Sequence, residues 1–319
     1  APPACVPPVP LLLAGRQART RRRRSFAVIM KDAIDLLVSL DQNYLPQLRV
    51  MLTSVYLNDP GTPCRVYLLH SGIPAPVLEQ LRQEIARLDF TLHPIPVDDA
   101  LFQDAPVMQQ YPKEMYYRLL AGQLLPKELD RVLYLDPDIL VINPLQPLWQ
   151  ADMEGCLFAA AAHTGLTELA NNVNRLRLGT EQNYYNSGVL LIDLARCRQE
   201  IVPEDIFAFV RAHGPELLLP DQDILNALYA DRILALDDVI WNYDARNYRN
   251  YLMRSYGEAD LPWVTAHTAI LHFCGREKPW KPHYRRRFGV LYLHYMQLTA
   301  RLLAPAEAGL PDAPRRPRL

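Results

Sequence analysis

The sequence predicts an α/β protein with a parallel sheet, because strand-like and helix-like segments alternate between residues 34 and 97. Apolar runs of strand length cover 34–40, 65–69 and 90–97. The segment 45–57 carries a proline in its first turn, and 75–88 has apolar residues at helical spacing. This β-α-β-α-β order is typical of parallel strands joined by right-handed crossovers. Sheets of this kind bind ligands beyond the carboxyl ends of their strands.

Composition places the chain among ordinary globular proteins. It has 319 residues, of which 50% are hydrophobic and 22% charged, and its net charge is −1. No excess of positive charge favours nucleic acid as a partner. The five cysteines are scattered without zinc-site spacing, and no apolar stretch reaches the ~20 residues of a membrane span. We therefore expect a reduced, cytoplasmic protein.

The two ends of the chain differ from its centre. Residues 1–29 combine a proline-rich start with four arginines at 21–24, which follow the apolar residues instead of preceding them as in a signal peptide. We interpret this segment as a disordered or non-native extension. The main domain is expected over 30–280. Residues 281–319 form a basic and aromatic tail, with a helix over 288–303 and a disordered end.

A pair of aspartates follows the apolar strand 132–135. Asp136 and Asp138 are separated by Pro137, so both side chains point the same way in an extended segment. Two carboxylates at one point are suited to a hard divalent cation such as Mg²⁺ or Mn²⁺. The alternative is a turn at the end of a strand with two solvated aspartates.

Other polar residues lie at the predicted ends of strands or helices. Asp41 and Asn43 follow the first strand, and a helix predicted over 113–124 carries Arg118. Asp221 opens a short helix at 224–229, where it could simply cap the helix. His272 alternates with apolar neighbours in the strand 269–275, so it could be a core histidine instead of a ligand.

Nucleotide-binding motifs of two common kinds are absent. No G-x-G-x-x-G follows the first strand, and no G-x-x-x-x-G-K-[ST] occurs anywhere. These absences argue against a dinucleotide dehydrogenase and a P-loop enzyme.

Five motifs occur together in one order. They are Ser-Leu-Asp-Gln-Asn-Tyr at 39–44, Tyr-Arg at 117–118, Leu-Asp-Pro-Asp at 135–138, Asn-Ser-Gly-Val at 186–189 with Asp-Gln-Asp at 221–223, and His-Phe-Cys-Gly-Arg-Glu-Lys-Pro-Trp at 272–280. In this order they resemble the retaining glycosyltransferases of family 8, which include bacterial lipopolysaccharide galactosyl- and glucosyltransferases. The resemblance covers roughly 35–280. It implies the GT-A fold: a single Rossmann-like nucleotide-diphospho-sugar transferase domain with a mixed central sheet, here followed by a C-terminal helical tail.

The resemblance also implies roles for individual residues. Asp136, Asp138 and His272 would bind Mn²⁺, with Mg²⁺ as an alternative. The residues implied to contact a UDP-hexose donor are Ser39, Asp41 and Asn43 at the uridine, Gly275 and Lys278 at the diphosphate, and Arg118, Asn186, Asp221 and Gln222 around the sugar. His163-Thr164 stands where some members carry an acidic residue that touches the sugar, which leaves galactose and glucose both open.

The implied function is transfer of galactose or glucose, with retention, to a glycan or a lipid-linked acceptor of the lipopolysaccharide type. Gln222 is an amide and a poor nucleophile, so we favour attack on the same face of the sugar, with Asp221 as the alternative nucleophile. Two other functions stay open: a sugar nucleotidyltransferase and a non-catalytic carbohydrate-binding module.

The tail and two loops add expectations about the acceptor. Loops at 98–112 and 240–262 are expected to shape its site, and Tyr243, Tyr248 and Tyr251 could stack on sugar rings or pack internally. In the tail, four cations lie beside four aromatic residues: Lys281, Arg285, Arg286 and Arg287 beside Tyr284, Phe288, Tyr292 and Tyr295. This pattern predicts peripheral attachment to the anionic inner face of the cell membrane. The alternative is that the helix packs on the domain.

Overall fold

The computed structural model describes residues 31–98, 116–162 and 177–304. The chain divides after residue 30, and all described residues belong to the second unit, residues 31–319. The extension expected at 1–29 therefore lies outside the described residues, as do residues 99–112 of the loop expected at 98–112, and His163 and Thr164.

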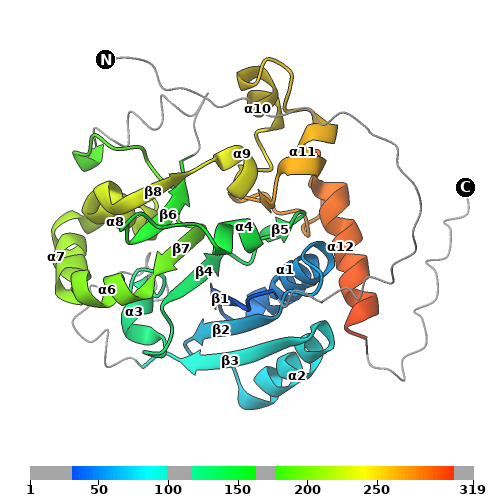
Figure 1. Cartoon of the computed structure of the whole chain (residues 1–319), viewed down its shortest axis with the longest axis horizontal. Helices are drawn as coiled ribbons and strands as arrows, with labels where there is room; N and C mark the ends of the chain where they lie inside the picture. Colours follow the sequence, from blue (N-terminus) through cyan, green and yellow to red (C-terminus); the bar gives the residue numbers. More distant parts are fainter. Residues whose placement is uncertain (1–30, 99–115, 163–176, 305–319) are drawn as a thin grey trace, which may run out of the picture. The chain divides into compact units, whose positions relative to one another are not determined.

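A seven-stranded mixed sheet forms the centre of the second unit (Figure 1). Its strands, in chain order, are β1 Ile34–Ser39, β2 Cys64–His70, β3 Phe90–Pro96, β4 Arg131–Leu135, β6 Phe158–Ala161, β7 Val189–Asp193 and β8 Ile233–Leu236. The spatial order is β3-β2-β1-β4-β7-β6-β8. Strands β3, β2, β1 and β4 are parallel to one another, as the alternation of elements predicts. Strand β7 runs antiparallel to both β4 and β6, and this makes the sheet mixed.

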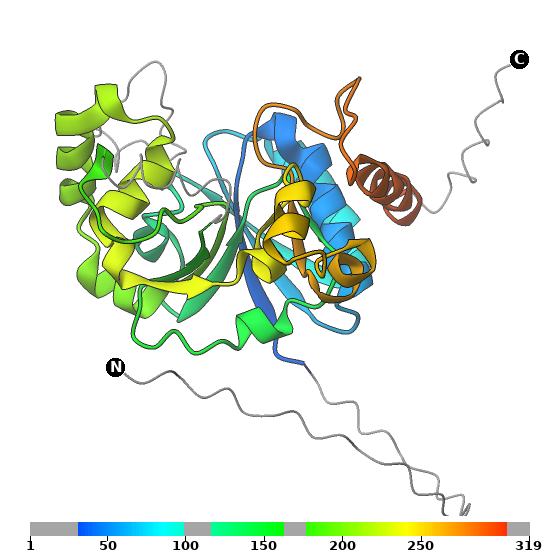
Figure 2. The ribbon, with the colours of Figure 1, turned by 90° about the horizontal axis from the view of Figure 1, so that it is seen from above.

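Helices cover both faces of this sheet (Figure 2). One face packs against α1 Leu45–Asn58 and α2 Ala75–Ile85, and the other against α3 Ala121–Leu124, α6 Leu194–Glu200, α7 Pro203–His213 and α8 Pro220–Tyr229. In β1, Leu36 and Val38 are buried in the apolar cluster on the side of α1 and α2, and Leu37 is buried in the cluster on the opposite side. Because both faces are covered, the strand is an almost continuous apolar run.

A second, three-stranded sheet has the order β5-β10-β9. It consists of β5 Ile139–Val141, β9 Tyr243–Asp244 and β10 Ile270–His272. Strand β10 is antiparallel to β5 and parallel to β9. The register pairs His272 with Ile139, so the end of β10 lies beside the start of β5. Strands β4 and β5, separated by the two aspartates, therefore belong to different sheets.

The remaining helices are α4 Gln146–Trp149, α9 Asp238–Trp241, α10 Tyr248–Arg254, α11 Leu261–His267 and α12 Gly289–Leu302. Helix α12 packs against α1. A hydrogen bond of 2.6 Å from Asn58 Nδ2 to the hydroxyl of Tyr295 joins the two helices. Among the helices of the described ranges, none is both long and apolar enough to cross a bilayer.

Several aromatic residues of the tail and of the 240–262 loop form a common apolar cluster. Phe288, Tyr292 and Tyr295 are buried there together with Tyr243 and Tyr251. The packing alternative therefore applies to Tyr243 and Tyr251, which are not available as stacking surfaces for sugars. The aromatic side chains that were expected to face a membrane from positions 288, 292 and 295 instead face the core.

Two predicted helices begin at different residues from those expected. Helix α3 starts only at Ala121, and Arg118 lies in the turn before it, so the prediction that Arg118 is helical was wrong. Helix α8 starts at Pro220 instead of 224. Asp221 is therefore inside the first turn of the helix and is not its N-cap, which is Leu219.

Candidate active site

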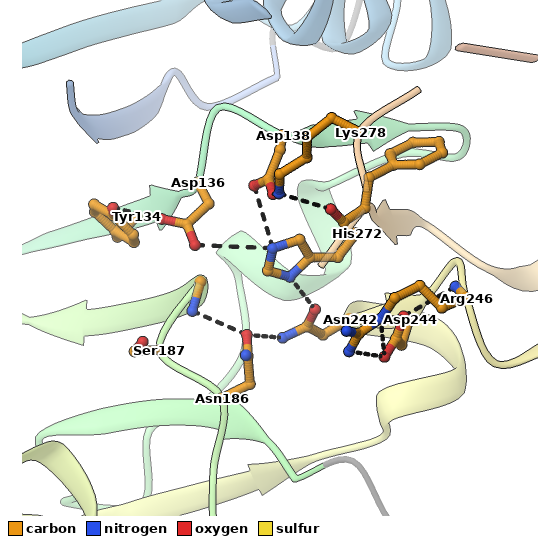
Figure 3. Close-up of polar contacts among 12 residues, drawn as sticks. Tyr134, Asp136, Asp138, Asn186, Ser187, Asn242, Asp244, Arg246, His272 and Lys278 are labelled. Carbon is orange, nitrogen blue, oxygen red and sulfur yellow. Dashed lines mark hydrogen bonds and ion pairs between the residues drawn. The ribbon is translucent and has the colours of Figure 1, made fainter. Parts of the chain in front are cut away.

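The two aspartates and His272 converge at the joint between the two sheets (Figure 3). Asp136 follows β4, Asp138 precedes β5, and His272 ends β10. The Nε2 atom of His272 lies 3.3 Å from an oxygen of Asp138 and 3.8 Å from an oxygen of Asp136. One candidate ligand atom from each residue lies within 4.8 Å of the others. His272 is thus not an isolated core histidine.

This geometry fits a divalent metal ion. Ligands on one ion, with bonds of about 2.1 Å, lie at most about 4.2 Å apart, so small side-chain rotations would close the group around an ion. The two carboxylates suit Mg²⁺ and Mn²⁺, whereas the single imidazole is a ligand that transition-metal ions bind more readily than Mg²⁺ does. Within the described ranges, no second group of three such side chains is this close together.

Positive side chains of the protein compensate the charge of Asp138. Lys278 donates a hydrogen bond to one of its oxygens, and His272 lies near the other. Burial alone would raise the pKa of Asp138, but His272 and Lys278 hold this pKa well below its usual range. Burial likewise opposes the charged form of His272, yet the interactions with Cys274 and Asp138 raise the pKa of His272 well above its usual value.

Arg118 links Asp136 to Asp221. Its guanidinium lies 3.2 Å from Asp136 and 3.0 Å from Asp221, and it stacks 4.4 Å from the centre of the Tyr134 ring. The hydroxyl of Tyr134 donates to Asp136 at 2.7 Å, and that of Ser187 donates to Asp221 at 2.7 Å. Although burial opposes a charged guanidinium, the carboxylates raise the pKa of Arg118, which therefore stays charged. The capping interpretation of Asp221 was wrong, because its carboxylate contacts Ser187 and Arg118.

A chain of side-chain amides runs from Gln222 to His272. The oxygen of Gln222 accepts from Asn186 Nδ2 at 3.0 Å and from the backbone N–H of Ser187 at 3.4 Å. The oxygen of Asn186 in turn accepts from Asn242 Nδ2 at 2.8 Å. The oxygen of Asn242 faces Nδ1 of His272 at 2.9 Å.

Gly188 lies directly against His272 and Asp136. A Cβ atom at Gly188 would lie 2.4 Å from Cε1 of His272 and 2.5 Å from an oxygen of Asp136, closer than real Cβ contacts. Because Gly188 has no side chain, its backbone can approach the group of Asp136, Asp138 and His272, called the metal group below.

A pocket of about 510 Å³ opens at the carboxyl ends of β1 and β4. Its lining includes Ser39, Leu40, Asp41, Tyr44, Arg118, Asp136, Pro137 and Asp138. Asn43 donates from its backbone and its side chain to Asp41, at 2.8 and 3.2 Å. Gly275 follows β10 with a φ of +82°, and a Cβ there would lie 2.5 Å from the Arg246 guanidinium.

Most of the expected site residues thus lie in one region of the structure. They either line this pocket or are hydrogen-bonded to residues that belong to the site. Sequence patterns did not single out Asn242 or Tyr134, and they assigned no role to Tyr44 or to Ser187, although Ser187 belongs to the motif at 186–189. Tyr44 belongs to the motif at 39–44 and could have been found there. Asn242 offers no signal in one sequence, because its role depends on β9 and β10 lying side by side.

Comparisons with known proteins place this site in a family. The model of glycosyl transferase family 8 matches residues 35–283. General stress protein A of Bacillus subtilis strain 168 is 30% identical over 278 residues, with 84% of this chain and 95% of that protein covered. A lipopolysaccharide 1,2-glucosyltransferase of Escherichia coli K12 is 27% identical over 263 residues, with coverage of 78% and 73%. The solved structure of the galactosyltransferase LgtC with donor and acceptor sugar analogs superposes with a TM-score of 0.69 at 25% identity, with coverage of 82% and 95%.

The mixed sheet and its structural neighbours define the class of protein, a glycosyltransferase of the GT-A fold. More narrowly, the chain belongs to glycosyl transferase family 8. The family and fold expected from the motifs are confirmed. Membership favours glycosyl transfer over both a nucleotidyltransferase and a non-catalytic binding module.

Proposed function

We propose that this enzyme moves a hexose, galactose or glucose, from a UDP-sugar to a glycan or lipid-linked acceptor of the lipopolysaccharide type, with retention. One observation carries the proposal. The group of Asp136, Asp138 and His272 adjoins a pocket that also contains Ser39 and Asp41, at the ligand-binding edge of the sheet. The name of the E. coli relative supports glucose transfer to lipopolysaccharide, and that of LgtC supports galactose transfer.

Asp136, Asp138 and His272 would hold the metal ion, for which we propose Mn²⁺, with Mg²⁺ as the alternative. When bound, the ion neutralises charge on the leaving diphosphate. Lys278 adds a second positive charge beside Asp138 and would contact the same diphosphate, close to the backbone of Gly275. Ser39, Asp41 and Asn43, at the end of β1, would hold the uridine.

The contacts of Asp221 and Gln222 support attack on the same face of the sugar. Asp221 is already paired with Arg118 and accepts from Ser187, which lowers its availability as a nucleophile. The oxygen of Gln222 accepts two hydrogen bonds. In the reaction we propose, the acceptor oxygen bonds to the anomeric carbon as the bond to the diphosphate breaks. The acceptor's proton passes to the leaving phosphate oxygen. Arg118, Asn186 and Gln222 would orient the sugar.

We also propose that the tail brings the enzyme to an anionic membrane surface. Lys281 and Arg285–287 remain exposed, and so do Val290, Leu293 and Met296 on the outer side of α12. Basic and apolar side chains together favour anionic lipid. Flotation with anionic and neutral vesicles at low and high salt tests this. The control is a variant in which the four cations are changed to glutamine. If neither the intact protein nor this variant binds anionic or neutral vesicles, the membrane proposal is contradicted.

A screen of UDP-sugars with Mn²⁺ tests the central proposal. We expect UDP release from UDP-galactose or UDP-glucose, and none from the same mixture with excess chelator. The Asp138→Asn variant is the matched control for contaminating hydrolases. If no UDP-sugar supports release, or if the variant matches the unaltered enzyme, the proposed donor reaction is wrong.

A further inference from the structure

Asn242 lies between His272 of the metal group and Asn186, which is proposed to contact the sugar (Figure 3). It follows α9 and is fully buried. Its side chain uses both ends: the oxygen faces Nδ1 of His272, and the nitrogen donates to Asn186. The backbone N–H of Asn242, which donates to Asp238, already completes the helix end, so the amide is not needed as a cap.

The direction of these hydrogen bonds follows from a backbone group. The N–H of Gly188 can only donate, and it points at the side-chain oxygen of Asn186 at 3.0 Å. Since that atom is an acceptor, the atom of Asn242 facing it must be the NH₂ group. The other end of Asn242 is then an oxygen, which requires a proton on Nδ1 of His272.

We propose that Asn242 is a positioning residue that fixes the ring orientation and tautomer of His272 for metal binding. With a proton held on Nδ1, Nε2 is the ring nitrogen left to bind an ion beside Asp136 and Asp138. A hydrogen bond from the other ring nitrogen commonly orients a metal-binding histidine. The inference rests on the proposed metal site and deepens it.

The same amide joins the metal group to the sugar side. By donating to Asn186, Asn242 holds the oxygen of that residue in place, and the NH₂ group of Asn186 then faces the oxygen of Gln222. Asn242 therefore makes two separable contacts, called the two arms below: one to His272 and one to Asn186. A residue replacing Asn242 should affect metal binding or sugar positioning according to which of these hydrogen bonds it keeps.

Two substitutions separate the arms. Asn242→Leu keeps a branched side chain but removes both hydrogen bonds. Asn242→Asp keeps an acceptor for Nδ1 of His272 but turns its second oxygen toward the oxygen of Asn186. Asn58→Leu is the matched control, because Asn58 also donates through its amide, to Ser54, Val141 and Tyr295, and lies outside the site.

The main readout is the affinity of the folded protein for Mn²⁺ and for UDP, measured by calorimetry beside the melting temperature. We expect Asn242→Leu to weaken Mn²⁺ binding about 10- to 100-fold, the usual effect of losing such a partner. Asn242→Asp should retain most of the Mn²⁺ affinity but lower kcat. Asn58→Leu should lower the melting temperature only. In ¹⁵N-histidine spectra of Zn²⁺-loaded protein, Nδ1 of His272 should carry the proton.

Three results would overturn the inference. Asn242→Leu could melt earlier yet bind Mn²⁺ like the unaltered protein, which would make Asn242 purely structural. Asn242→Asp could lose as much Mn²⁺ affinity as Asn242→Leu, or the ring proton could be found on Nε2. If the unaltered protein itself binds no Mn²⁺, the metal site is refuted, and the inference that rests on it fails for that separate reason.

Discussion

Lys278 donates a hydrogen bond to Asp138, so a residue proposed to meet the diphosphate is already bound to a candidate metal ligand. Its second hydrogen bond, of 2.9 Å, goes to the backbone oxygen of Phe273. A metal ion approaching Asp138 therefore meets a competing positive charge. If Asp138 binds the metal ion and Lys278 the diphosphate, as proposed, Lys278 leaves Asp138, at least in part, when both ligands enter.

The first prediction concerns Lys278→Met. Without nucleotide, its affinity for Mn²⁺ should equal or exceed that of the unaltered enzyme, because a like charge is removed. Its affinity for UDP with Mn²⁺ present should fall roughly 10- to 100-fold, as expected for the loss of a hydrogen bond to a charged group. Calorimetric titrations in both orders measure the two effects. Weaker Mn²⁺ binding without nucleotide would contradict the proposed competition.

Removing the metal, or one carboxylate, should abolish catalysis. Asp138→Asn and Asp136→Asn keep the side-chain shape but lose charge at the metal. We expect kcat/KM to fall at least ~10³-fold, about 4 kcal/mol of barrier. Activity is measured as UDP release in excess chelator, before and after Mn²⁺ is added back. Full activity in chelator, with no increase when Mn²⁺ is added, would rule out the metal assignment for Asp136, Asp138 and His272.

Gly188→Ala should disrupt the metal site from below. Its Cβ would collide with both His272 and Asp136, and relieving that overlap must move a ligand or the backbone. Overpacking of this kind costs about 1–3 kcal/mol, so Mn²⁺ affinity should fall roughly 10- to 100-fold.

Gly122→Ala is the control for Gly188→Ala. A Cβ at Gly122 would also be tight, at 3.2 Å from the backbone nitrogen of Arg198, but it lies in α3. This variant should lose stability without losing Mn²⁺ affinity. If both variants bind Mn²⁺ normally when folded, Gly188 has no special relation to the metal group.

Gln222→Ala should lower kcat far more than it changes the KM for the donor, because its proposed contact is with the reacting sugar. Initial rates over a range of UDP-sugar concentrations separate the two parameters. A change in KM alone would assign Gln222 to binding only. Mass spectrometry should find no sugar on Asp221 in stalled reactions, and a covalent adduct there would overturn same-face attack.

Local pattern was enough to predict the parallel half of the sheet and helices α1, α2 and α12. These elements depend on short-range periodicity and on residues that mark the start of a helix, such as Pro46, and both can be read from one sequence. Periodicity does not predict the antiparallel insertion of β7 between β4 and β6, because apolar runs do not encode direction.

At the site, the sequence was enough to predict the candidate metal ligands, but not the residues that hold these ligands in place. The motifs around Asp136 and His272 gave candidate ligands, whereas Arg118 was placed in a helix that starts three residues later. The roles of Asn242 and Gly188 depend on contacts between segments distant in sequence. The same holds for Tyr243 and Tyr251, whose burial depends on Phe288 arriving from the tail.

The two carboxylates of the metal group belong to different sheets, since Asp136 follows β4 and Asp138 precedes β5. An ion bound by both would cross-link the two sheets on either side of Pro137 and would resist rotation of the small sheet against the large one. Binding to the folded state alone also raises stability in proportion to the logarithm of ion concentration. Amide exchange in β5 and β10 should therefore slow as Mn²⁺ is added. If the site binds metal as proposed, the rigidity of the enzyme depends on the metal content of its surroundings as well as on its own packing.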